Sequence, residues 1–149
     1  MAVSVTGKVL LDTNVFIDYL RADLHADWIF GGVSNTSRFL SAIVLMELRV
    51  GADTPRRKRA GDRIRAAFST ERLIARLPPL FDDAGRLFRA LYGDGFGLSE
   101  RPGPMNDLLI ALTARQMGAT LVTSNLQEFR RIAAHVSGLK VVTPVDRAN

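Results

Sequence analysis

The sequence predicts an α/β domain in which helices cover a mostly parallel sheet of four to five strands. Three observations support this prediction: short apolar runs of strand length, helical segments between them, and capping residues where the two kinds of segment meet. The length of 149 residues fits one domain over residues 1–149 that is large enough to bury a core. The sequence contains no internal repeat and no low-complexity segment.

Composition limits the chemistry that the chain can perform. It has no cysteine and only two histidines, His25 and His135, so disulfides and thiolate metal sites are excluded. Neither histidine stands in a metal-ligand spacing, so a bound metal would have oxygen ligands, which favours Mg²⁺ or Mn²⁺. No apolar run is long enough to cross a bilayer and no signal-peptide pattern is present, so we expect a cytoplasmic protein.

The net charge of +5 comes mainly from arginine, which supplies 17 of the 20 basic residues. Guanidinium groups fit phosphate oxygens, so a polyanionic partner is one interpretation of this bias. The alternative is that arginine simply replaces lysine on an ordinary surface.

The first strand is predicted at the apolar run Val9–Leu11, which ends at Asp12. Thr13 and Asn14 are good N-caps for the amphipathic helix that follows. A carboxylate at the carboxyl end of a strand opens into the crevice where α/β proteins bind ligands. Asp12 is therefore a candidate functional residue, and the alternative is that it serves only as a second capping residue.

A second strand and helix follow at residues 37–41 and 42–50, with Ser41 as the expected cap and the apolar cluster Trp28–Phe30 before them. The cluster is expected to cover the core or a partner surface. Glu47 lies inside the apolar helix, where burial of an acid is unfavourable unless it is paired or holds a cation. We favour a functional role for Glu47 over the alternative of a solvent-facing side chain.

Thr54 and Pro55 begin a helix that is expected to reach Phe68. This helix contains the one local cluster of basic residues, which includes Arg56, Arg57, Lys58, Arg59 and Arg63. Such a cluster is usually a solvated helix face, and the more specific interpretation is a surface that binds RNA or a protein partner.

The second half of the chain continues the alternation of strands and helices. The expected elements are strand 72–77, helix 81–92, a Gly/Pro loop 93–104, helix 105–117, strand 120–123, helix 126–132 and strand 139–142. Asp82 and Asp83 suit the start of a helix and are interpreted as structural. Asp107, expected in the first turn of its helix, has the same interpretation when taken alone.

Taken together, the polar residues at strand ends and on neighbouring helices make a stronger case. Asp12 and Asn125 each follow a predicted strand, and Glu47 and Asp107 lie on helices beside the same sheet edge. Converging carboxylates without His or Cys are suited to holding one or two divalent cations. Without a metal, such like charges repel one another.

Four segments in order resemble the PIN-domain ribonucleases, and most closely the VapC toxins of toxin–antitoxin pairs. They are Leu10-Leu-Asp12-Thr-Asn14, Ser41-x5-Glu47-Leu-x-x-Gly51, Asn106-Asp107-x-Leu-Ile-Ala111 and Leu121-Val-Thr-Ser-Asn125-x-x-x-Phe129. Each motif is short, but four of them in this order across most of the chain are quite specific.

The resemblance implies a three-layer α/β/α sandwich that cuts RNA with Mg²⁺ or Mn²⁺. It further implies a homodimer that a cognate antitoxin holds inactive. Carried over residue by residue, Asp12, Glu47 and Asp107 form the acidic triad, and Asp12 and Asp107 are the expected metal ligands. The supporting residues are Thr13, Asn14 and Thr123.

Asn125 departs from the family pattern, in which the fourth position is often Asp. An amide oxygen can still act as a ligand but contributes no charge, which favours one metal over two. The competing hypotheses are an RNA-binding module without catalysis, a haloacid-dehalogenase-like phosphatase, and a nuclease for another substrate such as a DNA flap. The phosphatase is disfavoured because its chemistry needs a second acid two residues after Asp12, where this chain has Asn14.

Overall fold

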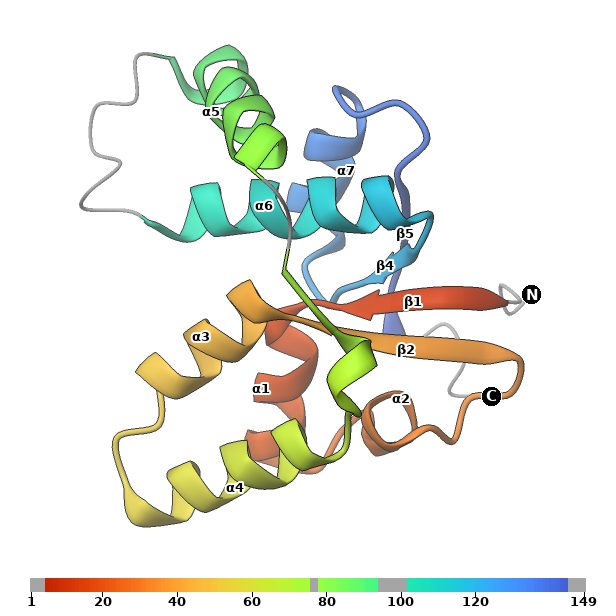
Figure 1. The fold of residues 1–149 in the computed structure, drawn as a ribbon, viewed down its shortest axis with the longest axis vertical. Helices are drawn as coiled ribbons and strands as arrows, with labels where there is room; N and C mark the ends of the chain where they lie inside the picture. The colour runs from red at the N-terminus through yellow and green to blue at the C-terminus, as the bar shows by residue number, and fades with distance from the viewer. Residues whose placement is uncertain (1–4, 76–77, 94–101, 145–149) are drawn as a thin grey trace.

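Five parallel strands form the centre of the protein, in the order β3-β2-β1-β4-β5 (Figure 1). The computed structural model describes residues 5–75, 78–93 and 102–144. The strands are β1 Gly7–Leu11, β2 Thr36–Ser41, β3 Leu73–Ile74, β4 Thr120–Val122 and β5 Lys140–Val142. Since β1 is the middle strand, the residue at its carboxyl end lies at the centre of one edge of the sheet.

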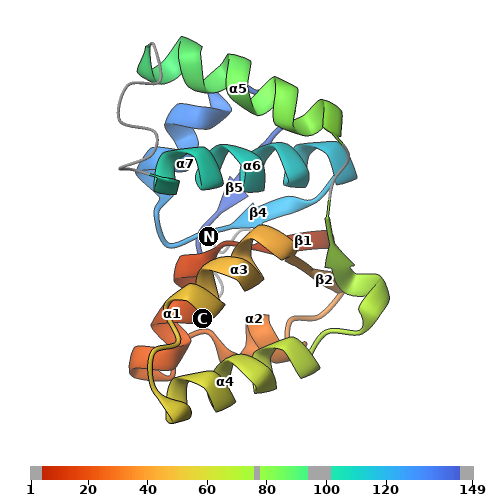
Figure 2. The same ribbon diagram turned by 60° about the vertical axis from the view of Figure 1, so that its left-hand side comes forward.

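Helices cover both faces of this sheet and give three layers. They are α1 Thr13–Ala22, α2 Ala26–Phe30, α3 Ala42–Val50, α4 Pro55–Ala66, α5 Pro78–Tyr92, α6 Pro102–Met117 and α7 Leu126–Ala133, with a 3₁₀ turn η1 at Thr70–Arg72. The helices α1 to α4 lie on one side and α5 to α7 on the other (Figures 1 and 2). The predicted α/β sandwich is therefore confirmed.

The core forms where the apolar strands meet the inner helix faces. The side chains of Val9, Leu10 and Leu11 on β1 are fully buried, as expected for a central parallel strand. Phe16 on α1 and Phe129 on α7 are also fully buried, one on each side of the sheet. Burial of this apolar surface is the main term that fixes the strand ends in place.

Several predicted boundaries are wrong, each for a local reason. The predicted N-caps Thr13 and Asn14 lie inside α1, and the N-cap is Asp12, whose side chain accepts a hydrogen bond from the backbone N of Thr13, so that this one residue separates the strand from the helix. The short helix α2 was not expected because its apolar cluster is too brief to show helical periodicity. The strand β3 comprises only Leu73–Ile74, since the preceding residues form the turn η1.

The helices α5 and α6 both begin earlier than predicted, at Pro78 and Pro102. Proline is tolerated in the first turn of a helix because the N–H groups there have no partner inside the helix. Asp107 therefore lies beyond the first turn of α6, and its interpretation as a residue that complements the helix dipole loses its basis. Of the predicted loop 93–104, residues 94–101 lie outside the described part of the chain.

In the part of the chain that the structure describes, no helix combines the length and apolar character needed to cross a membrane.

Candidate active site

Asp12 lies at the carboxyl end of β1 and is almost fully buried, with 3% of its surface exposed. Its Oδ1 accepts a hydrogen bond of 2.8 Å from the backbone N of Thr13, and its Oδ2 accepts one of 2.8 Å from Oγ1 of Thr123. The backbone N of Asp12 donates to the carbonyl of Val122 on β4. Asp12 therefore caps α1 and also presents a carboxylate at the centre of the sheet edge.

Glu47 is brought to the same place by α3. Its side chain is half-buried, and its Oε1 accepts a hydrogen bond of 2.7 Å from the hydroxyl of Thr13. Arg49 does not pair with Glu47, since its guanidinium lies 2.6 Å from Asp62 on α4. Glu47 is thus held at the start of α1 by a neutral donor, and it forms no ion pair among the described residues.

Asp107 completes an acidic cluster, which we define as Asp12, Glu47 and Asp107. Burial, together with the smaller effects of the charges of Asp12, Glu47 and Glu128 in that order, raises the pKa of Asp107 to about 7. The pKa of Asp12 is also raised, to about 6, mainly by burial and to a smaller extent by the charge of Glu47. Hydrogen bonds from Thr123 and Thr13 oppose the rise at Asp12 because they stabilise its ionised form.

A hydrogen-bond network holds β4 against α1 beneath this cluster. Nδ2 of Asn14 donates to Oγ1 of Thr123 at 3.2 Å, while Oδ1 of Asn14 accepts from the backbone N of Ser124 at 2.9 Å. Thr123 is fully buried, and its oxygen also accepts from the backbone N of Asn125 at 3.0 Å. The three predicted supporting residues, Thr13, Asn14 and Thr123, thus contact the acids or one another.

Asn125 is less closely involved than the other predicted residues. It follows β4 and is the N-cap of α7, but its exposed side chain makes no capping hydrogen bond. Its backbone joins the network through Thr123. The structure therefore places Asn125 at the correct sheet edge without an interaction between its amide and the acidic cluster.

The donor set of this site is made of oxygen atoms alone. Carboxylates, threonine hydroxyls and an asparagine amide suit a hard divalent cation such as Mg²⁺. Among the described residues, no three His, Cys, Asp or Glu side chains lie close enough together to form a ready-made metal cage. The chemistry of the site fits Mg²⁺ or Mn²⁺, but the described side chains do not form a complete coordination site.

Two further groups beside the cluster were missed in the sequence. The hydroxyl of Tyr92 on α5 donates to Oε1 of Glu128 on α7, and the guanidinium of Arg131 lies 4.9 Å from the Tyr92 ring centroid. Burial and then Glu128 raise the pKa of Tyr92 to about 12. Glu128 lies three residues after Asn125 and directly before Phe129 in the fourth motif. This position was the signal in the sequence that could have indicated Glu128.

A second missed group lies where α1 meets the end of β4. Oγ of Ser124 donates to Oδ2 of Asp18 at 2.7 Å, and Nε2 of His25 lies 3.3 Å from the same carboxylate oxygen. Helical spacing places Asp18 one turn after Asn14, but nothing in the sequence indicates that Ser124 would face it.

The predicted basic cluster on α4 lies apart from the acids. All five of its residues, Arg56, Arg57, Lys58, Arg59 and Arg63, are exposed. Arg57 pairs with Asp53 at 2.6 Å, and in the described part of the chain none of the five forms an ion pair with the acidic cluster.

Comparison with known proteins identifies the family. The sequence profile of the PIN domain matches residues 9–135, which cover most of the chain and all four motifs. The chain therefore belongs to the PIN domain family. A comparison with curated protein sequences gives no match.

Solved structures of toxin–antitoxin proteins have the same fold. DNA-bound VapBC from Salmonella typhimurium is 27% identical with a TM-score of 0.65, over 92% of this chain and 98% of that chain. VapBC-1 from nontypeable Haemophilus influenzae is 25% identical with a TM-score of 0.63, over 93% and 98% of the two chains. A toxin–antitoxin complex from Klebsiella pneumoniae is 25% identical with a TM-score of 0.57, over 91% and 97%.

Proposed function

We propose that this protein is a divalent-metal-dependent endoribonuclease and the toxin of a toxin–antitoxin pair, acting as a single nuclease domain. The observation that carries the proposal is the meeting of Asp12, Glu47 and Asp107 at one sheet edge from three separate elements. Each of the two raised pKa values includes a contribution from another member of the cluster. Such crowding of acids is unfavourable by itself and is typical of a site that binds a cation.

Asp12 and Asp107 are the residues that we assign as metal ligands. A divalent cation bound there would supply positive charge for the phosphate and lower the pKa of a water molecule. Thr123 and the backbone N of Thr13 fix the Asp12 carboxylate through its two oxygens. Fixed ligands reduce the reorganisation needed when substrate arrives.

Glu47 is assigned as the group that orients the attacking water and accepts its proton. The hydroxyl of Thr13 holds Oε1 of Glu47 at 2.7 Å, which sets the orientation of the whole carboxylate. A carboxylate can act as general base when it lies within hydrogen-bond reach of the proton that it removes. Asn14 acts indirectly. Its amide donates to Thr123, and the hydroxyl of Thr123 in turn positions Asp12.

An antitoxin partner is supported by the likeness to VapBC and to the Klebsiella pneumoniae toxin–antitoxin complex. We propose a homodimer as the catalytic form, following the family resemblance. The basic cluster on α4 would then contact RNA or the antitoxin. Its exposure over four consecutive positions, Arg56 to Arg59, is compatible with either partner.

The proposal is tested by incubating the purified protein, free of antitoxin, with a labelled pool of single-stranded RNA. The reactions contain Mg²⁺, Mn²⁺ or EDTA, and are repeated with Asp107→Asn and with the matched control Asp83→Asn. Asp83 is an exposed acid on α5, so its substitution removes the same charge away from the cluster. We expect metal-dependent cleavage that Asp107→Asn abolishes and Asp83→Asn retains.

Two other results would count against the nuclease. Folded protein that binds RNA but never cuts it would favour the binding module without catalysis. Cleavage that survives both EDTA and Asp107→Asn would be assigned to a contaminating ribonuclease, and the proposed site would lose its support.

A further inference from the structure

An open hollow of about 350 Å³ lies beside the first half of β2 and the segment that follows α4. Two arginines and three hydroxyl side chains contribute to its wall, and no Asp or Glu does. These polar residues are Thr36, Ser37, Arg38, Ser69 and Arg72. We call this hollow the Arg38 pocket.

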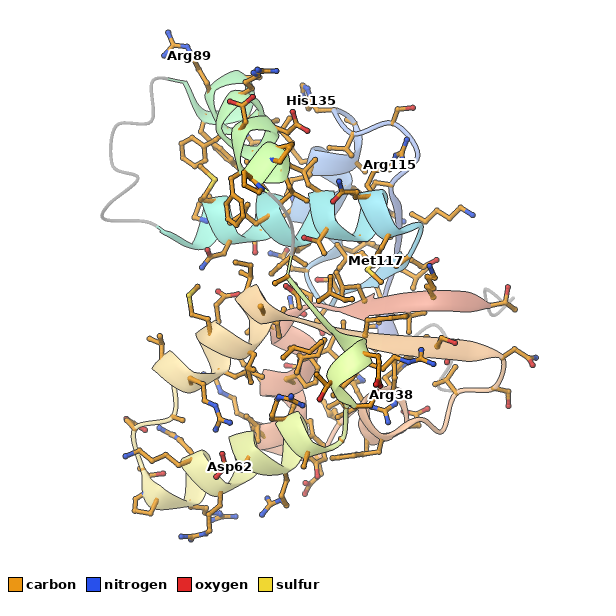
Figure 3. The ribbon with its side chains drawn as sticks, viewed as in Figure 1. Arg38, Asp62, Arg89, Arg115, Met117 and His135 are labelled. Carbon is orange, nitrogen blue, oxygen red and sulfur yellow. The ribbon has the colours of Figure 1, made fainter. Side chains whose placement is uncertain are left out.

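The two guanidinium groups of the Arg38 pocket are held in place by aromatic rings. The Cζ of Arg38 lies 4.5 Å from the centroid of the Phe68 ring, and the Cζ of Arg72 lies 4.8 Å from that of Phe39. Gly31 at the end of α2 allows the close approach of Arg38, because a Cβ there would lie 3.2 Å from Nε. Figure 3 shows Arg38 beside β2 and the turn η1. The cations are therefore preorganised by packing.

The positive charge of this pocket is not compensated within the described residues. Neither Arg38 nor Arg72 forms an ion pair there, and Nη1 of Arg38 is buried without a hydrogen-bond partner. Burial lowers the pKa of Arg38, and the neighbouring charge of Arg72 lowers it further. A buried donor without a partner is unfavourable, and so are two neighbouring positive charges. An anion bound between the arginines would accept a hydrogen bond from the donor and would also reduce the repulsion between the charges.

We propose that Arg38, Arg72 and the surrounding hydroxyls bind a phosphate group. Two guanidinium forks and the hydroxyls of Ser37 and Ser69 match a group with three or four oxygens better than a carboxylate with two. The hydroxyl of Thr36 already donates to the carbonyl of Val33 at 2.8 Å. The source is either a backbone phosphate of RNA, which rests on the proposed function, or free phosphate.

The Arg38 pocket is separate from the acidic cluster. Arg38 pairs with Val9 in the β1–β2 register, three residues before Asp12. That offset is about 10 Å along the strand. An anion in the pocket therefore lies away from the carboxylates that would repel it.

The first test is a titration of the full chain with inorganic phosphate in EDTA, at constant ionic strength set by chloride. The readout is the NMR shift of the arginine Nε–H and backbone resonances. We expect saturable shifts at Arg38, Arg72 and Ser69, and binding weaker by about tenfold in Arg38→Gln, since a charged donor is lost. Arg38→Lys should recover only part of the affinity because it keeps the charge and loses the fork.

Arg89→Gln is the matched control, since Arg89 projects from α5 at the far end of the molecule (Figure 3) and should leave phosphate binding unchanged. If Arg38→Gln fails to fold, Arg72→Gln gives the same test from the second guanidinium of the pocket. Absence of saturable shifts in the unsubstituted protein, or equal affinity in the folded Arg38 or Arg72 variant, would overturn the proposal.

A second titration with single-stranded RNA in EDTA distinguishes the two sources of phosphate. If Arg38→Gln binds RNA more weakly, and if the slope of log K against log salt falls by the amount expected for about one phosphate contact, the pocket binds the RNA backbone. Unchanged RNA binding together with lost phosphate binding would assign it to free phosphate. Neither titration requires cleavage or metal, so failure of the nuclease assay would leave both results interpretable.

Discussion

The hydroxyl of Thr13 donates a hydrogen bond of 2.7 Å to Oε1 of Glu47. This bond joins the first residue of α1 to α3, and Thr13 links the two acids, since its backbone N donates to Oδ1 of Asp12. A neutral donor orients the acid without cancelling its charge. The orientation of Glu47 therefore depends on Thr13 alone among the described residues.

Replacing Thr13 with Val should lower kcat/KM for RNA cleavage by about 10–100-fold, since a hydrogen bond to a charged group contributes about 1.5–3 kcal/mol. The free energy of unfolding should change little, because the backbone N of Thr13 still donates to Oδ1 of Asp12, the N-cap of α1. Cleavage kinetics and thermal unfolding measure the two effects. Thr13→Ser keeps the hydroxyl and is the control, and loss of activity in both variants would contradict an orienting role.

Replacing Thr123 with Val should reduce the free energy of unfolding by about 1–3 kcal/mol, because buried polar groups lose their partner. The hydroxyl is fully buried and donates to Asp12 while it accepts from Asn14 and Asn125. Urea unfolding measures the loss, and Thr123→Ser should recover most of it. Equal stability of the Val variant and the unsubstituted protein would show that water replaces the network.

The sequence was sufficient to predict the layers of the fold for a physical reason. Apolar runs and helical periodicity reflect burial, and the apolar run Val9–Leu11 on β1 is fully buried up to the point where Asp12 follows the strand. Chain order then places Glu47 and Asp107 on neighbouring helices. Apolar runs and helical periodicity are local patterns, so they can be recognised in short segments of the sequence.

Other features depend on contacts that no short window contains. Tyr92 meets Glu128 across the α5–α7 packing, and Ser124 meets Asp18 only because β4 lies beside β1. The Arg38 pocket likewise joins β2 to η1. Helix starts at Pro78 and Pro102 were missed because proline is usually a signal for a break, although it is accepted in the first turn.

The raised pKa values of Asp12 and Asp107 predict how the metal-free protein responds to pH. A raised pKa means that the folded state binds more protons than the unfolded state between the ordinary value of 3.8 and the folded values of about 6 and about 7. Stability from these groups is therefore fully present below about pH 4 and is lost as the pH rises through 6 and 7. In EDTA, the free energy of unfolding should fall by roughly 4 kcal/mol from pH 5 to pH 8, since Asp12 loses stability over about one pH unit and Asp107 over about two, at about 1.4 kcal/mol per unit.

Asp107→Asn isolates this effect from the titration of other groups. The variant cannot ionise at this position, so its stability should fall less than that of the unsubstituted protein over the same range. It should also be the more stable of the two at pH 8 in EDTA. Urea unfolding at each pH provides the comparison. If the free energy of unfolding falls equally with pH in the two proteins, the pKa of Asp107 is not raised in the folded state.

Replacing Asn125 with Asp should raise the affinity for Mg²⁺, because the substitution adds a negative charge at the edge that carries the acidic cluster. An added charge near a cation in a polar environment contributes about 1.4 kcal/mol, which corresponds to about tenfold tighter binding. Isothermal titration calorimetry measures the affinity, and Asn125→Ala is the control that removes the amide without adding charge. Because the side chain of Asn125 is exposed, both variants should fold. Unchanged Mg²⁺ affinity in Asn125→Asp would show that this position lies too far from the cation to influence it, and would leave Asp12 and Asp107 as the residues that determine metal binding.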